Sequence, residues 1–415
     1  MRVLLVAIGS HGDVLPFLAL AAELDRRGHA VTLAAPAPFA PMAERAGLGF
    51  HPLGTRADYA DFAAEPELWH PRRGVKAAFR YVSLLTEPTY AWLAQTWRPG
   101  EGIVVGSTLS LGARVAQDKL GLPLATVHLM PFLVESRHAP PILPGFPLPG
   151  FLPPRFRHWL GRGADTYVIG PAVLPELNAF RARLGLPPVR RLRHWWNSPL
   201  RVLLTFADWF VPPQPDWPAQ AVQVGFPLAD RFGDADDLSP DLAAFLDAGE
   251  APLAFTYGSA MRQGRKFFET AVRTCRRMGR RGVLLAPQDG QVPPGLPSDI
   301  LHVPYAPFSR LLPRCASLIH HGGIGTVAQG LAAGIPQLVV PVAFDHFDEA
   351  QRLRHLGVGS ALSQRRFTPR RAAAEIRRLL TAPQVAGACA AVRARMAGSD
   401  GVPAACDALE SLHPA

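Results

Sequence analysis

The chain has 415 residues, of which 48% are hydrophobic and 18% are charged, and its formal net charge is +10. This composition is typical of a globular protein with room for two domains, and it excludes a disordered or fibrous chain. No apolar run approaches the roughly 20 residues that a membrane helix needs. The first apolar run, residues 3–8, is too short for the core of a signal peptide, so we expect a cytoplasmic protein.

The positive charge has one bland and two functional interpretations. A coding bias toward arginine is the bland one, and affinity for a diphosphate or for an acidic membrane surface are the functional ones, which leaves peripheral membrane contact open. A nucleic acid partner is not expected, because no basic stretch is interleaved with aromatic residues and no reading helix is present. The four cysteines show no metal-ligand spacing, which predicts buried thiols.

Short apolar runs alternate with helix-like runs along both halves of the chain. In the first half the strand-like runs are 3–8, 30–35, 103–106, 124–129 and 201–205, and the helix-like runs are 16–27, 111–120 and 175–184. The strand-like runs of the second half are 253–257, 282–286, 317–319 and 337–342. This alternation is typical of parallel βα units. We therefore predict an α/β fold of two doubly wound, Rossmann-like domains that face each other across a cleft.

A proline-rich segment, residues 212–218, separates the two series and has the composition of a linker. It predicts an N-terminal domain over residues 1–212 and a C-terminal domain over 213–415, with the last helix free to pack back on the first domain.

Two stretches of the first half break the alternation. Residues 59–97 are rich in aromatic side chains, and residues 131–154 contain eight prolines together with Phe132, Phe146 and Phe151. Long insertions in a compact domain are often binding loops. Any single aromatic is expected to complete the core, but as a set on insertions they favour a lipophilic acceptor pocket.

The most informative stretch is residues 320–326, which read His-His-Gly-Gly-Ile-Gly-Thr between a predicted strand and a helix. A glycine turn before a helix points backbone N–H groups at one place, which suits a phosphate, and His321 and Thr326 can add side-chain donors. Asp345 and His346 follow the next predicted strand, and parallel strands bring both loops to the same sheet edge. One loop for phosphates and one for hydroxyls predicts a nucleotide-sugar site.

These motifs carry a family resemblance. Residues 305–350 resemble the donor-binding signature of family 1 glycosyltransferases, which have the GT-B fold. Residues 9–14, Gly-Ser-His-Gly-Asp-Val, resemble the opening motif of the bacterial branch that contains rhamnolipid-type rhamnosyltransferases and sterol glucosyltransferases, and residues 177–226 are similar to that branch too. The resemblance implies an N-terminal acceptor-binding domain and a C-terminal nucleotide-sugar-binding domain.

The resemblance also implies a catalytic base. Asp13 occupies the position of the residue that takes the proton from the acceptor hydroxyl, and His11 is the reserve candidate, because a neutral imidazole is a competent base. Without the resemblance, Asp13 before a helix would be read as an ordinary N-cap.

For the donor, the resemblance implies roles for residues that match its signature. These are phosphate contacts by Gly258, Ser259, His321 and Thr326 at the glycine turns that include Gly323 and Gly325, base stacking by Tyr305 with backbone contacts from Ala306, ribose contact by Gln329, and sugar hydroxyl contacts by Asp345 and His346. His320 is expected to be structural. The family's usual residue at position 346 is Gln, so His346 leaves the sugar open.

The predicted function follows from these residues. We expect an inverting, metal-independent transfer of a hexose, rhamnose or glucose, from a dTDP- or UDP-sugar to a hydroxyl of a lipophilic acceptor such as a hydroxyacyl lipid, a sterol or a polyketide-like aglycone. The nucleotide sugar is a co-substrate and no cofactor is expected. The alternatives are a nucleotide-sugar 2-epimerase on the same fold and a non-catalytic nucleotide-sugar-binding protein.

The sequence contains no convincing pattern for two other chemistries. Residues 234–236, Asp-Ala-Asp, match the Asp-x-Asp pattern of metal-dependent glycosyltransferases, but they lie in an acidic stretch that does not follow a hydrophobic strand, so no metal site is predicted. A serine hydrolase is not expected, since no Gly-x-Ser-x-Gly elbow lies between a strand and a helix.

Overall fold

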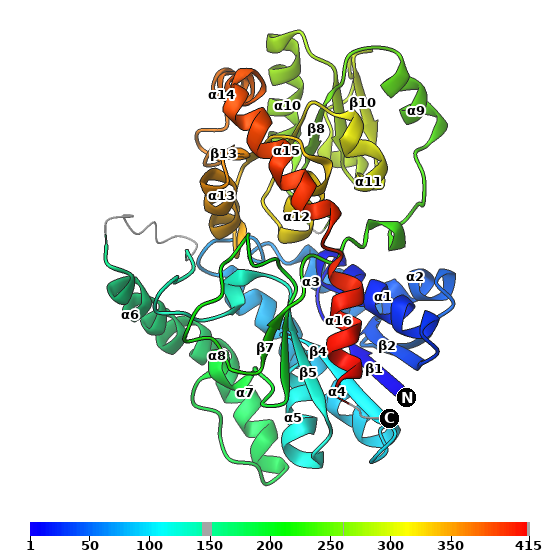
Figure 1. Ribbon diagram of the computed structural model, residues 1–415, viewed down its shortest axis with the longest axis vertical. Coiled ribbons are helices and arrows are strands. Elements are labelled where there is room, and N and C mark those ends of the chain that lie inside the picture. The colour runs from blue at the N-terminus through cyan, green and yellow to red at the C-terminus, as the bar shows by residue number, and fades with distance from the viewer. Residues whose placement is uncertain (143–151, 260, 413–415) are drawn as a thin grey trace. The chain divides into compact units, whose positions relative to one another are not determined.

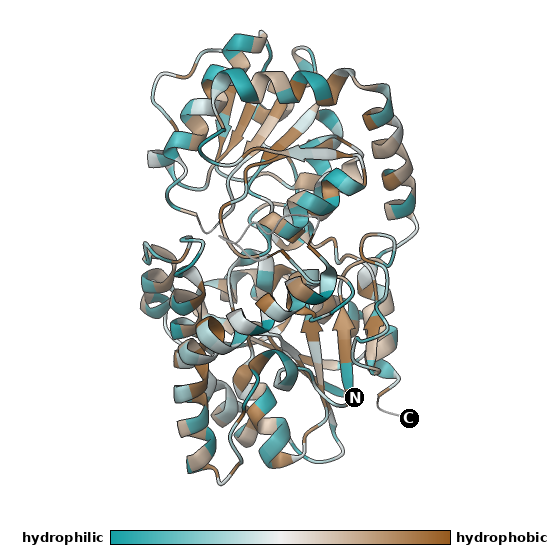
Figure 2. Cartoon of the chain, turned by 90° about the vertical axis from the view of Figure 1, so that its left-hand side faces the viewer, coloured by the Kyte–Doolittle hydropathy of each residue, from teal (hydrophilic) through white to brown (hydrophobic). Residues whose placement is uncertain are grey.

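The computed structural model of the protein describes residues 1–142, 152–259 and 261–412, and these form two α/β units (Figure 1). Unit 1 comprises Met1–Pro227 and Asp400–Ala415, and unit 2 comprises Leu228–Ser399. Each unit contains one sheet of parallel strands, so the predicted α/β fold with two doubly wound domains is confirmed. Figure 2 shows that the strands of each sheet are predominantly hydrophobic, as expected for parallel sheets covered by helices on both faces.

The sheet of unit 1 has seven strands in the order β3-β2-β1-β4-β5-β6-β7. Their bounds are β1 Arg2–Val6, β2 Ala30–Pro36, β3 Gly49–Leu53, β4 Gly102–Ser107, β5 Leu124–His128, β6 Arg201–Leu204 and β7 Ala221–Gln223. The helices are α1 His11–Arg26, α2 Ala40–Arg45, α3 Arg56–Ala64, α4 Gly74–Thr96, α5 Leu111–Leu120, α6 Pro154–Ala164, α7 Gly170–Arg183, α8 Leu192–Trp195 and α16 Gly401–Glu410. The strand order reverses between β1 and β4, so the loop from β1 to α1 lies at a topological switch point.

The sheet of unit 2 has six strands in the order β10-β9-β8-β11-β12-β13. Their bounds are β8 Leu253–Thr256, β9 Gly282–Leu285, β10 Ile300–Val303, β11 Ser317–His320, β12 Gln337–Val339 and β13 Gly359–Ala361. The helices are α9 Pro240–Asp247, α10 Arg265–Met278, α11 Phe308–Leu311, α12 Ile324–Ala333, α13 His346–His355, α14 Pro369–Thr381 and α15 Pro383–Ala397. The switch point lies between β8 and β11, which places the loops after these two strands side by side.

The division between the units differs from the predicted boundary at residue 212. The proline-rich segment lies inside unit 1, where it connects β6 to β7, because Val202 of β6 pairs with Ala221 of β7. The chain passes into unit 2 only at Leu228. The proline cluster thus marks a stiff connection within one sheet.

The last helix, α16, belongs to unit 1 and packs on α1. Arg27, at the end of α1, donates hydrogen bonds to Asp407 Oδ1 at 2.6 Å and to Glu410 Oε2 at 2.7 Å. His29 Nε2 lies 2.7 Å from the other oxygen of Glu410. This ion network and the buried side chains of Val402, Cys406 and Leu409 hold the helix in place.

The aromatic stretch at residues 59–97 is mostly helical, so its interpretation as an irregular insertion is wrong. It forms α3 and the 23-residue helix α4. Phe79, Tyr81 and Trp92 of α4 are buried in the core of unit 1. These aromatics therefore complete the core, which was the expectation for any single one of them. Phe146 and Phe151 of the second stretch lie outside the described residues.

Candidate active site

In unit 1 the candidate base lies in the first turn of α1. The helix begins at His11 with Ser10 as its N-cap, so Asp13 is the third helical residue and not the cap itself. Its Oδ2 accepts hydrogen bonds from the Ser10 backbone N–H at 2.7 Å and from the Ser10 hydroxyl at 3.1 Å. Gly9 has φ +136°, and a Cβ there would collide with the Asp13 carboxylate, so the turn requires glycine.

The surroundings of Asp13 tune its acidity. Burial raises the pKa of its carboxyl to about 6, against the lowering effect of the two hydrogen bonds from Ser10. A base that titrates near neutral pH can take a proton from a substrate hydroxyl and release it again. His11 is the first residue of the same helix, and its ring packs edge-on against Phe39 with a centroid distance of 5.0 Å. The structure thus brings both candidate bases into one helical turn.

His128, which the sequence did not single out, ends β5 at the same carboxyl edge of the sheet. It is fully buried, and its two ring nitrogens lie 2.7 Å from Thr108 Oγ1 and 2.7 Å from Asn197 Oδ1. Burial lowers the pKa of His128 to about 4. With both nitrogens bonded inside the protein, we assign this histidine a structural role.

In unit 2 the glycine turn after β11 opens onto the start of α12. Gly323 is the N-cap of this helix, and among the described residues no side chain caps it. The first N–H groups of an uncapped helix are therefore donors for an anion. Gly322 has φ +110°, and a Cβ at this residue would lie 2.9 Å from Val339 Cγ1, so a side chain does not fit here. Thr326 lies in the first turn of α12, and Gln329 is buried further along the helix.

His321 lies between this turn and the turn after β8. A Cβ at Gly323 would approach His321 Nε2 to 2.6 Å, and a Cβ at Gly258 would approach its Cε1 to 3.2 Å. The side chain is buried, and its Nδ1 has no hydrogen-bond partner among the described residues. Burial lowers the pKa of His321 to about 4, so the ring is neutral at pH 7. The two glycines thus leave space for a neutral imidazole beside the open helix end.

His346 completes this group at the start of α13. Its ring meets that of His321 edge-on, with 4.8 Å between centroids. His346 Nδ1 accepts hydrogen bonds from the backbone N–H groups of Val342 and Ala343, each at 3.3 Å. Because Nδ1 is an acceptor, Nε2 carries the proton, and burial together with His321 holds the pKa of His346 well below its usual range. This histidine is therefore a neutral donor, whereas a Gln amide would offer both a donor and an acceptor.

The remaining predicted donor residues lie along the same edge of the sheet. Asp345 is buried at the N-cap of α13, and Ser259 is exposed beside Gly258. Tyr305 and the buried Ala306 follow β10, three strands from β11, and the Tyr305 hydroxyl donates to the Asp230 carbonyl at 2.9 Å. Three strand spacings are about 14 Å. The structure therefore groups Gly258, His321, Gly323, Asp345 and His346, and it places Tyr305 and Ala306 further along this edge.

A second residue that the sequence analysis missed is Glu349, on α13. Its backbone N–H bonds the Asp345 carbonyl at 3.0 Å, and its carboxyl group is fully buried. Neither carboxyl oxygen has a hydrogen-bond partner within the described part of the chain. Burial raises the pKa of Glu349 well above its usual range, with Arg352 opposing the shift and Asp348 and Asp345 adding to it. A carboxyl group with this surrounding is expected to be protonated at neutral pH.

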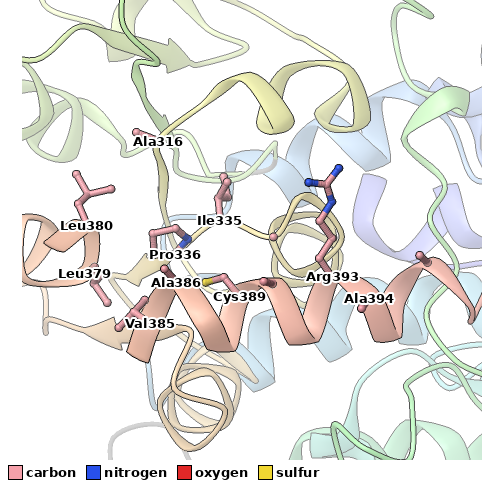
Figure 3. A pocket seen from close by; sticks show the side chains of 13 residues that line it. Ala316, Ile335, Pro336, Leu379, Leu380, Val385, Ala386, Cys389, Arg393 and Ala394 are labelled. Atoms are coloured by element: carbon pink, nitrogen blue, oxygen red, sulfur yellow. The ribbon is translucent and has the colours of Figure 1, made fainter. Parts of the chain in front are cut away.

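Two further features lie away from this group. Asp234 and Asp236 are exposed in a loop, and among the residues that the structure describes no three His, Cys, Asp or Glu side chains are placed to hold a metal ion. A cavity of about 590 Å³ lies between α15 and the residues that precede β11 and β12, including Ala316, Ile335 and Pro336 (Figure 3). These residues are at the amino ends of the strands, so the cavity is at the edge opposite to the glycine turns. No described helix is long and apolar enough to cross a bilayer.

Comparison with family models matches both parts of the chain. The glycosyltransferase family 28 N-terminal domain model matches residues 3–137, and the erythromycin biosynthesis protein CIII-like, C-terminal domain model matches residues 283–409. The second match contains the glycine turn, His321 and His346. The first contains His11 and Asp13.

Individual relatives are similar over almost the whole chain. The O-mycaminosyltylonolide 6-deoxyallosyltransferase of Streptomyces fradiae is 33% identical over 99% of this chain and 97% of its own length. A sterol 3-beta-glucosyltransferase of Arabidopsis thaliana is 25% identical over all of this chain and 68% of its own length. Among solved structures, the spinosyn rhamnosyltransferase complexed with thymidine diphosphate superposes with a TM-score of 0.70 at 21% identity, covering 99% of this chain and all of that one.

Proposed function

The chain belongs to the GT-B glycosyltransferases, and from this premise we propose that it moves a hexose from a dTDP- or UDP-sugar to a hydroxyl of a lipophilic acceptor, acting in the cytoplasm, with inversion and without a metal ion. Rhamnose and glucose are the proposed sugars. Hydroxyacyl lipids, sterols and polyketide-like aglycones are the proposed acceptors.

The observation that carries the donor assignment is the open end of α12 beside His321. An uncapped helix N-terminus attracts negative charge, and the buried Nδ1 of His321 has no partner among the described residues. A diphosphate supplies the acceptor oxygens that such a site lacks. Donors fixed in place before the reaction stabilise the charge that develops on the leaving diphosphate. In this proposal the site acts without Mg²⁺, so EDTA is expected to leave turnover unchanged, and restoration of lost activity by Mg²⁺ would contradict it.

On the acceptor side we propose that Asp13 is the general base. The carboxylate takes the proton of the acceptor hydroxyl while the hydroxyl oxygen bonds to the anomeric carbon and the bond to the diphosphate breaks on the opposite face. One proton passes to Asp13, and the electron pair of the broken bond leaves with the nucleoside diphosphate. Because the hydroxyl attacks the face opposite to the diphosphate, the configuration at the anomeric carbon is inverted. A pKa of about 6 keeps Asp13 mostly ionised at pH 7, as this role requires.

The relatives favour one donor and one acceptor class within the proposal. The 33% identical relative is named for the transfer of a 6-deoxyhexose to a macrolide, and a rhamnosyltransferase of the same fold binds thymidine diphosphate. Among the proposed donors we therefore favour a dTDP-linked 6-deoxyhexose, and among the proposed acceptors a polyketide-like aglycone. His346 can only donate a hydrogen bond, because its Nδ1 already accepts from the backbone. It therefore suits a sugar whose hydroxyl oxygen accepts one hydrogen bond at the position where a Gln amide would both donate and accept.

A thermal-shift screen of nucleotides and nucleotide sugars tests the donor assignment without knowledge of the acceptor. Saturating ligand stabilises the folded state by about 2.7 kcal/mol at 100 times Kd. We expect dTDP and UDP to differ in the shift they cause and His321→Ala to reduce it. A chain that converts the donor to its C2 epimer in the absence of any acceptor would be an epimerase, which would overturn the transferase proposal.

A further inference from the structure

Exposed apolar side chains of the described chain are concentrated on one short segment. Six large hydrophobic side chains are exposed, and four of them lie on α6 and the π-helical turn that follows it at Asp165–Ile169. These four are Phe156 at 44% exposure, Trp159 at 64%, Tyr167 at 80% and Val168 at 40%. We call them the α6 patch. Clustered exposed apolar groups of this size mark interaction sites.

The segment is arranged in the reverse of an ordinary surface helix. Phe156 and Trp159 are three residues apart on one face, and their rings are stacked with 5.8 Å between centroids. Two polar side chains of the segment face inward beside Ile169: His158 lies 3.7 Å from Glu135, and the 14% exposed Asp165 lies 3.6 Å from Arg193. A helix that only covers the core would bury its aromatics and expose these groups. The exposed aromatic side chains therefore indicate a surface that binds a partner.

Charge indicates which partner. Arg155 and Arg162 are exposed beside the α6 patch, and the one acidic residue of the segment, Asp165, faces inward toward Arg193. Basic residues flanking Trp and Tyr are the pattern of a helix that lies in the interface of an anionic bilayer, where the rings enter the headgroup region. The +10 charge of the whole chain adds to this attraction. In Figure 1, α6 lies at the margin of unit 1, outside the helices that cover the sheet.

We propose that the α6 patch, flanked by Arg155 and Arg162, docks unit 1 on an anionic lipid surface. The lipid surface supplies negative headgroups for the two arginines and an apolar layer for Trp159, Phe156 and Tyr167. This inference does not depend on the identity of the sugar or the acceptor.

Co-sedimentation of the full chain with lipid vesicles tests the proposal. We expect binding to vesicles of equal parts phosphatidylglycerol and phosphatidylcholine, about tenfold or more tighter than to phosphatidylcholine alone, and weakened by salt. The aromatic variant Phe156→Ser/Trp159→Ser/Tyr167→Ser should lose this binding. Its matched control, Leu84→Ser/Leu200→Ser, removes the other two exposed apolar side chains and should bind as the unchanged chain does.

The charge component has its own pair of variants. Arg155→Glu/Arg162→Glu should weaken binding to the anionic vesicles by about tenfold or more, since each arginine contributes on the order of 1 kcal/mol at an anionic surface. Arg370→Glu/Arg371→Glu makes the same change of charge on exposed residues of α14 and should have a much smaller effect. Unchanged thermal midpoints show that the variants are folded.

Three outcomes would overturn the proposal. The first is no binding of the unchanged chain to anionic vesicles, and the second is equal loss in the variants and their controls. The third is a concentration-dependent dimer that disappears in the aromatic variant, which would make the α6 patch an interface between two copies of this chain.

Discussion

The two units use the start of a helix in opposite ways. In both, a helix begins at the carboxyl edge of a central parallel strand, α1 after β1 and α12 after β11. The start of α1 holds a carboxylate of the protein itself, because Asp13 accepts the N–H and the hydroxyl of Ser10. The start of α12 holds no such group, because its N-cap is Gly323.

In the proposed function, this one structural device serves two parts of one reaction. A helix end that is filled by an internal anion fixes the position of that anion and tunes its pKa, which suits a base. A helix end that is left open keeps its donors for an external anion, which suits a leaving diphosphate. The sequence difference behind this is small: Ser10 and Asp13 at the start of α1, and Gly323 as the N-cap of α12.

The largest expected effect comes from removing the basic carboxylate of Asp13 at the start of α1. Asp13→Asn keeps an oxygen that can accept the hydrogen bonds of Ser10, so stability and donor affinity should change little. Turnover should fall by roughly 10²–10⁴-fold, the contribution typical of acid–base catalysis. Steady-state rates at saturating donor, with a thermal unfolding curve for each variant, measure both quantities.

His11→Gln made alongside assigns the remaining share of the base role. If Asp13→Asn stays active while His11→Gln is inactive, the proton goes to His11 and the comparison of the two helix ends fails. Activity in both variants would mean that this turn contains no base at all.

The second largest effect is expected at the open N-terminus of α12, on the affinity for nucleoside diphosphate. His321→Ala removes the buried imidazole beside α12 and should weaken nucleoside diphosphate binding by roughly 1.5–3 kcal/mol, the range for a hydrogen bond to a charged group. Titration calorimetry with dTDP and UDP gives the value. His11→Gln is the matched control, because it removes a histidine from unit 1 and should leave this affinity unchanged. Equal affinity in folded His321→Ala would contradict the assignment of the phosphate site.

The pH dependence of turnover distinguishes a general base at Asp13 from a residue that only caps α1. Since the pKa of Asp13 is about 6, activity should fall about tenfold for each pH unit below that value, as the base becomes protonated. The raised pKa also means that protonation stabilises the fold, so this contribution to stability is present at low pH and lost as pH rises through 6. Ser10→Ala removes a hydrogen bond that lowers the pKa, and should move the acid limb of the profile to higher pH. A limb that stays near pH 4 would show that burial does not tune Asp13.

The smallest effect concerns Glu349, a buried carboxyl group whose oxygens have no hydrogen-bond partner within the described residues. Glu349 has a raised pKa, so its favourable contribution to folding is fully present at low pH and is lost as pH rises through the folded pKa. Glu349→Met should therefore stabilise the protein more at pH 8 than at pH 5, by about 1–3 kcal/mol, the cost of an unsatisfied buried polar group. Urea unfolding at the two pH values measures the difference. A variant that is less stable at pH 8 would show that Glu349 is ionised and paired.

Much of the fold could be predicted because the central parallel strands are short apolar runs followed by a glycine or polar turn, whereas β3, β7, β10 and β13, of which β13 reads only Gly-Ser-Ala, were not predicted. Strands β8, β9 and β12 fall inside the predicted runs, and β11 extends one residue beyond its run, to His320. Helix α4 was missed because Pro88 and the many aromatic residues disfavour a helix locally, whereas burial of Phe79, Tyr81 and Trp92 outweighs that local cost. The predicted boundary at residue 212 differs from the division at Leu228, because a proline cluster has the same composition in a linker and in a connection between paired strands.

In the candidate site, too, some features could be predicted from the sequence and others could not. The glycine turn and its histidine are local features, so the sequence predicted them. The proton position on His346 depends on the N–H groups of Val342 and Ala343, and the isolation of Glu349 depends on the packing of α13. Such properties arise from the folded surroundings, and no spacing of residues along the chain reports them.

The return of α16 to unit 1 has a consequence for how the chain is made. Unit 2 is one continuous stretch, whereas unit 1 needs residues from both ends of the chain. On the ribosome, residues 228–399 can therefore fold before the first unit is complete, and the buried faces of α1 and α16 meet only after residues 401–410 have been made. Until then α1, with Leu20 and Leu24 on its buried face, lacks its cover. A nascent chain that stops before residue 400 is accordingly expected to expose unit 1 to chaperones and proteases and to leave unit 2 resistant, which pulse proteolysis of stalled chains would reveal.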